Sequence, residues 1–317
     1  SLGDDRLPFN GGKVSAWASI LDHLSRELDV LIVVSTGNYA HEPPDEGNSD
    51  HHVQGYPHYL MNNPAKIIEP ATGCVVLTVG SLANSADVPA GAGATVASRP
   101  IAQPGQPSPF TRSGPGIGGA IKPELCEYGG NLAYNGYTHM TQTLSEAAIV
   151  SLNREYLQRL FRADSGTSYA APKVARIAAL VWSDFPQGGT NLIRALLASS
   201  AIVPEQSRQI LEPISQAAVR QLCGYGVPSH ARALHSDSNR VVLHAQGALP
   251  FDMFHIYEVP IPDEIYSVDG QRRISVTLAF DPPVRHSRLD YLGTKMSFRL
   301  IRGKSINEVA AAFKKPK

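Results

Sequence analysis

The sequence has no excess of charge of either sign, because 28 lysines and arginines balance 28 aspartates and glutamates. Binding to nucleic acid or to an anionic membrane surface usually requires a basic excess, so neither partner is expected. No apolar run is long enough to cross a bilayer as a helix. A chain of 317 residues can form one large α/β domain and a smaller second one.

Cysteine is scarce as well. Cys74, Cys126 and Cys223 are far apart and odd in number, so they form neither a disulfide framework nor a metal-binding knuckle. No Asn-x-Ser/Thr glycosylation site occurs either. We therefore expect three reduced, mostly buried thiols and a reducing, cytoplasmic setting.

Patterns that would indicate a metal or a cofactor are weak. The polar segment 39–64 is rich in histidine and acidic residues, but their spacing matches no familiar zinc site, so a solvated loop is the favoured interpretation. Residues 114–119 spell a dinucleotide-binding pattern, yet no strand precedes them and Pro115 would disrupt the tight turn. We interpret this stretch as a loop and expect no metal and no cofactor.

The sequence does contain a candidate nucleophile at the start of a helix. Residues 173–182 are apolar on nearly every side and predict a buried helix, and Ser165-Gly-Thr-Ser-Tyr-Ala-Ala-Pro172 leads into it. Ser168 would lie among the N–H groups of the first turn, which favour an alkoxide or a tetrahedral oxyanion. Pro172 is expected in that first turn, where a missing N–H costs nothing. Alternatively, Thr167 or Ser168 only caps the helix, the more common role of an isolated hydroxyl there.

A second stretch strengthens the nucleophile hypothesis. Val30–Val34 is a short β-branched run typical of a central parallel strand, and it ends in Ser35-Thr-Gly-Asn38. Active sites of α/β sheets lie at this end of the strands. A strand followed by Gly-Asn, with Gly-Thr-Ser-x-Ala-Ala-Pro far downstream, closely resembles the subtilisin-like serine proteases, the subtilases. The resemblance implies a parallel sheet with helices on both faces, and an oxyanion hole formed by the Asn38 side chain and the Ser168 N–H.

The resemblance also implies where a substrate binds. The walls of the pocket for the residue before the scissile bond would be Ser1, Leu2, Gly3, Ser35, Thr36 and Gly37. Glycines in such walls let an extended peptide approach the backbone and pair with it as an added strand. Between the two walls, apolar residues at helical spacing predict an amphipathic helix over residues 14–28, which completes a strand-helix-strand unit.

Three later motifs follow in the order that the family has them. Residues 109–116 resemble its Phe-Ser-x-x-Gly-Pro turn with Thr111 in place of the serine, residues 121–129 its Lys-Pro-acidic strand, and residues 223–228 its Gly-x-Gly turn. A helix is expected over 191–198 and a short one over 229–234. The resemblance covers roughly the second half of the catalytic domain.

The chain also departs from the family. The subtilase triad needs an Asp and a His before the nucleophile, the His within a His-Gly-Thr motif, and no histidine here precedes a glycine. Asp164-Ser-Gly166 copies the Asp motif but abuts the nucleophile loop, so we interpret it as coincidence. Lys173 occupies a position that is often His. Residues 130–163 form an insertion in which 144–152 and 154–161 could each be helix or strand.

The last part of the chain has a different pattern. From about residue 239 apolar and polar side chains alternate, most clearly over 274–280 and 296–300, and residues 268–271 read as a hairpin turn. This pattern predicts a small antiparallel β-sandwich that ends in a short helix over 306–313. We therefore divide the chain into a catalytic domain, 1–235, and a β-domain, 236–317.

The leading hypothesis is a serine endopeptidase that cleaves a peptide or protein substrate, with the family's Asp and His encoded upstream of Ser1 in a segment that associates with this chain. The alternative is a catalytically incomplete fragment or pseudoprotease that binds peptides. The sedolisins share the Gly-Thr-Ser helix but stabilise the oxyanion with an Asp, so Asn38 counts against them.

Overall fold

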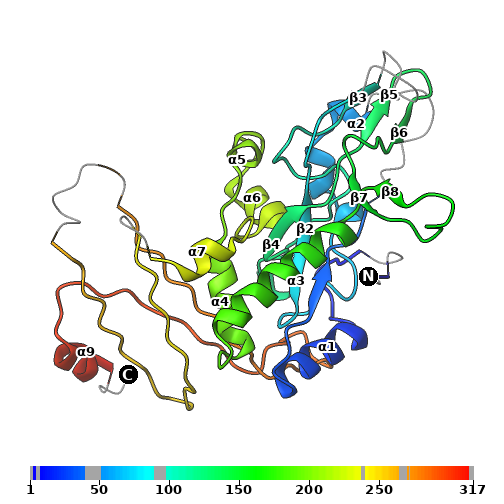
Figure 1. Ribbon diagram of the computed structural model, residues 1–317. Coiled ribbons are helices and arrows are strands. Elements are labelled where there is room, and N and C mark those ends of the chain that lie inside the picture. The colour runs from blue at the N-terminus through cyan, green and yellow to red at the C-terminus, as the bar shows by residue number, and fades with distance from the viewer. Residues whose placement is uncertain are drawn as a thin grey trace.

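A computed structural model of the chain describes residues 3–4, 8–39, 51–88, 98–236, 240–263, 270 and 272–313 (Figure 1). Its helices are α1 Ala16–Glu27, α2 His51–Gln54, α3 Thr167–Asp184, α4 Thr190–Ser200, α5 Glu205–Leu211, α6 Gln216–Cys223, α7 His230–Leu234 and α9 Ile306–Phe313, with short 3-10 helices η1 His58–Met61, η2 Asn63–Ala65 and η3 Ile117–Gly119. Its strands are β1 Val33–Ser35, β2 Leu77–Leu82, β3 Ser98–Pro100, β4 Leu125–Tyr128, β5 Ala133–Asn135, β6 Met140–Gln142, β7 Ile149–Leu152 and β8 Phe161–Asp164.

A parallel sheet of three strands, in the order β1-β2-β4, forms the centre of the fold. The register pairs Val33 with Leu77, and Val79 with Leu125. Every residue of β2 is buried, as expected for a parallel strand covered on both faces. Helices α3, α4 and α7 pack on one face of the sheet, while η1 and α6 pack on the other. The predicted subtilisin-like α/β architecture is therefore confirmed.

The helix predicted for residues 14–28 is α1, and the helix predicted for 191–198 is α4. The Ser15 side chain accepts a hydrogen bond from the Ala18 N–H and so caps α1. Within the described residues, no helix is both long and apolar enough to span a bilayer. The three cysteines are free thiols, as predicted, with Cys126 and Cys223 buried and Cys74 half-buried.

Two expectations, one about a loop and one about the start of a helix, need correction. Segment 39–64 is not simply a solvated loop, because η1 lies within it and buries Tyr59 and Leu60 against the sheet. Its first part, residues 40–50, which includes His41, lies outside the described residues. Pro172 lies in the second turn of α3 rather than the first, because the helix already begins at Thr167.

The insertion contains strands, one of the two possibilities that its sequence leaves open, whereas the described C-terminal part lacks the strands that its alternating pattern predicts. The insertion carries antiparallel strands: β5 and β6 join β3 in one small sheet, and β7 pairs with β8 in another. In the described residues from 240 to 305, by contrast, none lies in a strand, so the strands predicted over 274–280 and 296–300 are wrong. Alternation produces a strand only where a neighbour supplies hydrogen bonds and a second layer covers the apolar side chains, and here those side chains are exposed.

One part of the C-terminal segment is nevertheless attached firmly to the main body. The Tyr291 hydroxyl donates a 2.7 Å hydrogen bond to the Asp22 carboxylate of α1, and both side chains are buried. The same carboxylate accepts from the backbone N–H groups of Cys74, Val75 and Val76. Asp22 therefore joins α1, the segment before β2 and the chain around Tyr291 in one buried network.

Candidate active site

Ser168 is the second residue of α3, and its side chain is exposed. The face of α3 that carries Ala170, Ala171 and Val174 is buried against β2 and β4, which fixes the start of the helix over the sheet. The residue in the capping position is Gly166, which provides no side-chain cap. The capping interpretation of Thr167 and Ser168 is therefore wrong, and Ser168 lies within the first turn, where helical N–H groups lack intrahelical acceptors.

Asn38 connects the end of β1 to this first turn. Its Oδ1 accepts a 2.9 Å hydrogen bond from the Thr167 N–H and a 3.0 Å hydrogen bond from the Thr167 hydroxyl. A backbone N–H can only donate, so the atom that faces Thr167 must be the amide oxygen. Nδ2 is thereby turned away from Thr167, and it donates to no acceptor in the described part of the chain. Asn38 thus presents an oriented N–H donor beside the residue that precedes Ser168.

The loop before α3 is held by a second loop after β4. The Gly166 N–H donates to the Gly129 carbonyl at 2.8 Å, and the Ser165 hydroxyl donates to the Asn131 carbonyl at 2.9 Å. A side chain on Gly129 would overlap the Ser81 hydroxyl, so only glycine fits between β2 and this loop. The position of Ser168 therefore depends on close backbone packing at the carboxyl ends of β2 and β4.

Arg112 also holds the segment that contains Asn38, through its backbone. Its buried guanidinium donates to the Asn38 carbonyl at 3.1 Å and to the carbonyls of Pro64 and Lys66 at 2.8 and 2.9 Å. Thr111, next to it, accepts a 3.0 Å hydrogen bond from the Ser81 N–H through its side chain. Arg112 and Thr167, which sequence reasoning did not assign to this role, therefore orient the strand end that carries Asn38. Thr111 links the segment of Arg112 to β2.

The predicted substrate-binding residues are described in part. Ser1 and Leu2 lie outside the described residues. Gly3 and Gly37, from the two predicted walls, both lie against the Ile68 side chain. Thr36 is buried, and its N–H donates to the Val79 carbonyl at 3.0 Å. The structure therefore brings Gly3 close to the strand end that carries Asn38.

Gly37 should be sensitive to substitution. Its φ of +90° is rarely adopted by residues with a side chain, and a Cβ there would run into Ile68. We expect Gly37→Ala to lower the free energy of unfolding by roughly 1–3 kcal/mol, measured by urea denaturation. Gly247→Ala is the control, because a Cβ at that exposed position meets nothing closer than 3.9 Å. Equal stability of the two variants would contradict this account of the strand end.

Glu127 and Lys173 both form hydrogen bonds with the Tyr128 backbone. The Lys173 ammonium donates a 2.6 Å hydrogen bond to the Tyr128 carbonyl, and a Glu127 carboxylate oxygen accepts from the Tyr128 N–H at 2.9 Å. Burial raises the pKa of Glu127, although the nearby Lys173 opposes the shift, and burial lowers the pKa of Lys173. Lys173 therefore ties α3 to the end of β4, close to the loop that supports Ser168.

The raised pKa of Glu127 predicts a pH effect on stability. As pH rises above about 4.5, the unfolded chain loses this proton first, so the folded state is progressively disfavoured until pH passes the folded pKa. Glu127→Gln keeps an acceptor for the Tyr128 N–H but cannot ionise. We expect the difference in unfolding free energy between variant and parent to shift in favour of the variant from pH 4 to pH 7. A pH-independent difference would show that Glu127 ionises without a burial penalty.

Three histidines interact with residues other than Ser168. His139 interacts with the Tyr134 hydroxyl, His230 with Asp184, and His255 with the Tyr257 hydroxyl. Asp164, at the end of β8, pairs with Arg162 at 3.0 Å and accepts from the Ser165 N–H. The described residues thus bring the segment of the nucleophile and the Asn38 donor together, and these three histidines have other partners.

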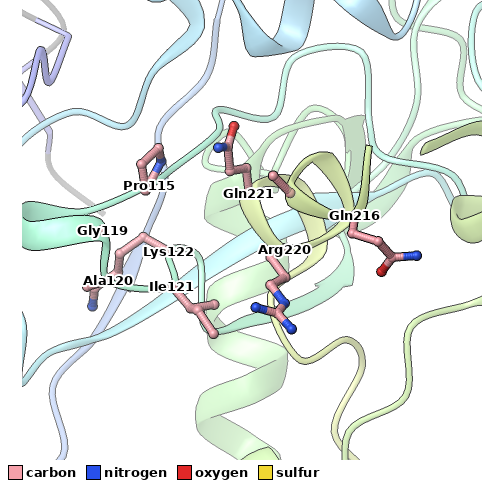
Figure 2. Close-up of a pocket in the computed structure, with 9 residues that line it drawn as sticks. Pro115, Gly119, Ala120, Ile121, Lys122, Gln216, Arg220 and Gln221 are labelled. Atoms are coloured by element: carbon pink, nitrogen blue, oxygen red, sulfur yellow. The ribbon is translucent and has the colours of Figure 1, made fainter. Parts of the chain in front are cut away.

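A hollow of about 290 Å³ lies away from Ser168, between residues 119–122 and helix α6 (Figure 2). Its most buried charge, the Lys122 ammonium, donates to the Val76 carbonyl at 2.8 Å and to the Glu124 carboxylate at 2.5 Å. None of the predicted site residues lines it. Because the Lys122 charge is already satisfied within the chain, this hollow adds no group to the candidate active site.

Comparison with known proteins gives consistent matches. The model of the subtilase family matches residues 1–226. An uncharacterized protein, y4bN, of Sinorhizobium fredii is 43% identical over 99% of this chain and 73% of its own length. Among solved structures, a protease of Pseudoalteromonas arctica is 17% identical, covering 70% of this chain and 47% of that one, with a TM-score of 0.42. MycP1 of Mycobacterium smegmatis is 23% identical, covering 75% and 48%, with a TM-score of 0.38.

The chain thus spans about half the length of these solved structures. The family match, by contrast, covers most of the chain and includes both segments that form the candidate site. The chain therefore belongs to the subtilase family of proteases.

Proposed function

We propose that this chain carries the nucleophile and the oxyanion hole of a serine endopeptidase. The observation that supports this most strongly is the Asn38 amide, which Thr167 holds with its oxygen toward α3 and its Nδ2 available as a donor. A fixed donor of this kind costs no reorganisation when negative charge develops nearby, which is the main requirement of an oxyanion hole.

In the proposed reaction, Ser168 Oγ attacks the carbonyl carbon of the scissile peptide bond and its proton passes to a general base. Asn38 Nδ2 and the Ser168 N–H donate to the resulting oxyanion. Collapse of the tetrahedral intermediate breaks the C–N bond, the amine leaves with a proton from the protonated base, and an acyl-enzyme on Ser168 remains. Water then attacks the acyl carbon while the base takes its proton. The new tetrahedral intermediate collapses, the ester bond to Ser168 breaks, and the serine oxygen regains a proton from the base.

The substrate is a peptide or protein held in extended form. The backbones of Ser1, Leu2 and Gly3 on one side and of Ser35, Thr36 and Gly37 on the other would pair with it. Glycine at two of these positions permits the close approach of a third strand.

The general base and its Asp partner come, in this proposal, from a segment outside residues 1–317. Three observations support it. β1 pairs only with β2 among the described strands and its residues are half-buried, although parallel strands are normally covered on both edges. Ile20, Leu24 and Leu28 of the adjacent helical region are exposed. The relative y4bN is longer than this chain, which covers 73% of it.

A peptide-binding module without catalysis is the second candidate function, because no histidine of this sequence lies in a His-Gly-Thr motif. Labelling with a fluorophosphonate separates the two. In protein that also carries the residues encoded before Ser1, we expect a covalent adduct that Ser168→Ala abolishes and that Ser183→Ala, a serine at the other end of α3, leaves intact. Absence of labelling in that protein would favour the binding module, and labelling that survives Ser168→Ala would overturn the assignment of Ser168.

A further inference from the structure

The hairpin formed by β7 and β8 lies directly beside the candidate nucleophile. β8 ends at Asp164, and the chain then passes through Ser165, Gly166 and Thr167 to Ser168. Among the described strands, β7 and β8 pair only with each other, so each has one open edge (Figure 1). An open edge can accept an extended peptide as an added strand.

One face of the hairpin is apolar and exposed. The antiparallel register pairs Val150 with Ala163 and Leu152 with Phe161, so these four side chains share a face. Leu152 is 72% exposed, and Leu157, in the connection between the strands, is 88% exposed. Single exposed apolar residues are ordinary, but a continuous group beside a candidate active site is typical of a binding surface.

The rest of the hairpin surface is rich in arginine. A hollow of about 680 Å³ is lined by Arg154, Arg159 and Arg162 together with Glu155 and polar side chains. Arg162 pairs with Asp164 at 3.0 Å, and Arg154 pairs with Glu155 at 3.3 Å. Arg159 has no acidic partner in the described part of the chain. The hollow therefore carries an excess of positive charge that complements carboxylates.

We propose that the β7–β8 hairpin is a docking site for the substrate polypeptide, and that it binds an extended segment, remote from the scissile bond, in which apolar and acidic side chains alternate. In such a segment successive side chains point to opposite sides. Apolar side chains would cover Val150, Leu152 and Phe161, while carboxylates would reach the arginines. The proposal rests on the proposed function, because it takes the occupant to be the substrate of Ser168.

Fluorescence polarisation tests this proposal without turnover, using the Ser168→Ala variant of protein that carries the residues encoded before Ser1. The probes are fluorescein-labelled peptides of equal length, one of repeating Leu-Asp and one of repeating Leu-Lys. We expect the Leu-Asp peptide to bind more tightly, and its binding to weaken as salt rises from about 0.05 to about 0.5 M, because exposed charges are then screened.

Variants locate the binding surface. Arg154→Ala combined with Arg159→Ala should weaken Leu-Asp binding by about three- to tenfold, since each exposed ion pair contributes modestly. Leu152→Ser combined with Leu157→Ser should weaken it as well. The matched control, Arg288→Ala with Arg299→Ala, removes two exposed arginines of the C-terminal segment that lie outside the hairpin, and should leave binding unchanged.

Three outcomes would overturn the proposal: equal binding of the two peptides, equal effects of the hairpin and control variants, or a dimer that dissociates when Leu152 and Leu157 are replaced. The dimer would identify a second copy of the chain as the occupant. Fluorophosphonate labelling of the parent protein keeps the two hypotheses separate. If Ser168 is labelled but the hairpin variants bind the peptide as the parent does, only the docking site is contradicted. If the hairpin variants weaken binding but Ser168 is not labelled, only the peptidase assignment is contradicted.

Discussion

Replacing Asn38 by alanine should lower the turnover number by roughly two to three orders of magnitude while leaving the Michaelis constant nearly unchanged, the usual effect of losing one oxyanion donor. The reason is the geometry of the amide. Its oxygen is occupied by the N–H and hydroxyl of Thr167, so the function left to the side chain is donation from Nδ2. Steady-state kinetics on a peptide ester would measure the effect in protein that also carries the residues encoded before Ser1.

Asn38→Asp is the informative companion. It keeps an oxygen for Thr167 and therefore the contact between β1 and α3, but it replaces the donor by a negative charge. We expect it to retain the thermal stability of the parent and to lose at least as much turnover as the alanine variant. Turnover within a few-fold of the parent in both variants would mean that Nδ2 does not face the reacting carbonyl.

The other large effect concerns the general base, which we propose lies outside residues 1–317. Residues 1–317 alone should hydrolyse no peptide ester, because a serine hydroxyl without a general base is scarcely nucleophilic at neutral pH. Val33 and Val34 are only half-buried in β1, so we also expect the isolated chain to be less stable than one in which a further strand covers that edge.

Assays of the purified chain, with and without the residues encoded before Ser1, supplied on the same chain or as a separate piece, would measure both effects. Activity that appears only with the added segment supports the proposed division of the catalytic groups. Full activity from 1–317 alone would show that one of its own histidines completes a rearranged site.

The sequence predicts the parts of this fold that repeat a simple periodic pattern. The β-branched run at 30–34, the amphipathic run at 14–28 and the apolar run at 173–182 correspond to β1, α1 and α3. Periodicity was enough to find all three, although only α3 buries the face that its pattern marks as apolar, while α1 leaves Ile20 and Leu24 of its apolar face exposed. The motifs around Asn38 and Ser168 then predicted that Asn38 follows β1 and that Ser168 lies at the start of α3. The packing of α3 on the sheet brings these two positions close together.

Contacts between distant segments could not be read in the same way. Thr167 looked like a helix cap, but its hydroxyl and N–H bind Asn38, a contact that exists only once β1 and α3 pack against each other. The alternating pattern over 274–280 predicted strands, yet the described residues there have no strand partner. The periodicity of a sequence shows which side chains could be buried on one face. They are buried only if another part of the chain packs against that face.

The most direct test of the central claim is the structure of the active protein inhibited by a peptidyl boronate. We predict a covalent bond between boron and Ser168 Oγ, and a boronate oxygen about 2.7–3.1 Å from Asn38 Nδ2, the distance expected for an oxyanion donor. A boronate bound to another residue, or one on Ser168 whose oxygens lie beyond hydrogen-bonding distance of Asn38 Nδ2, would contradict the account.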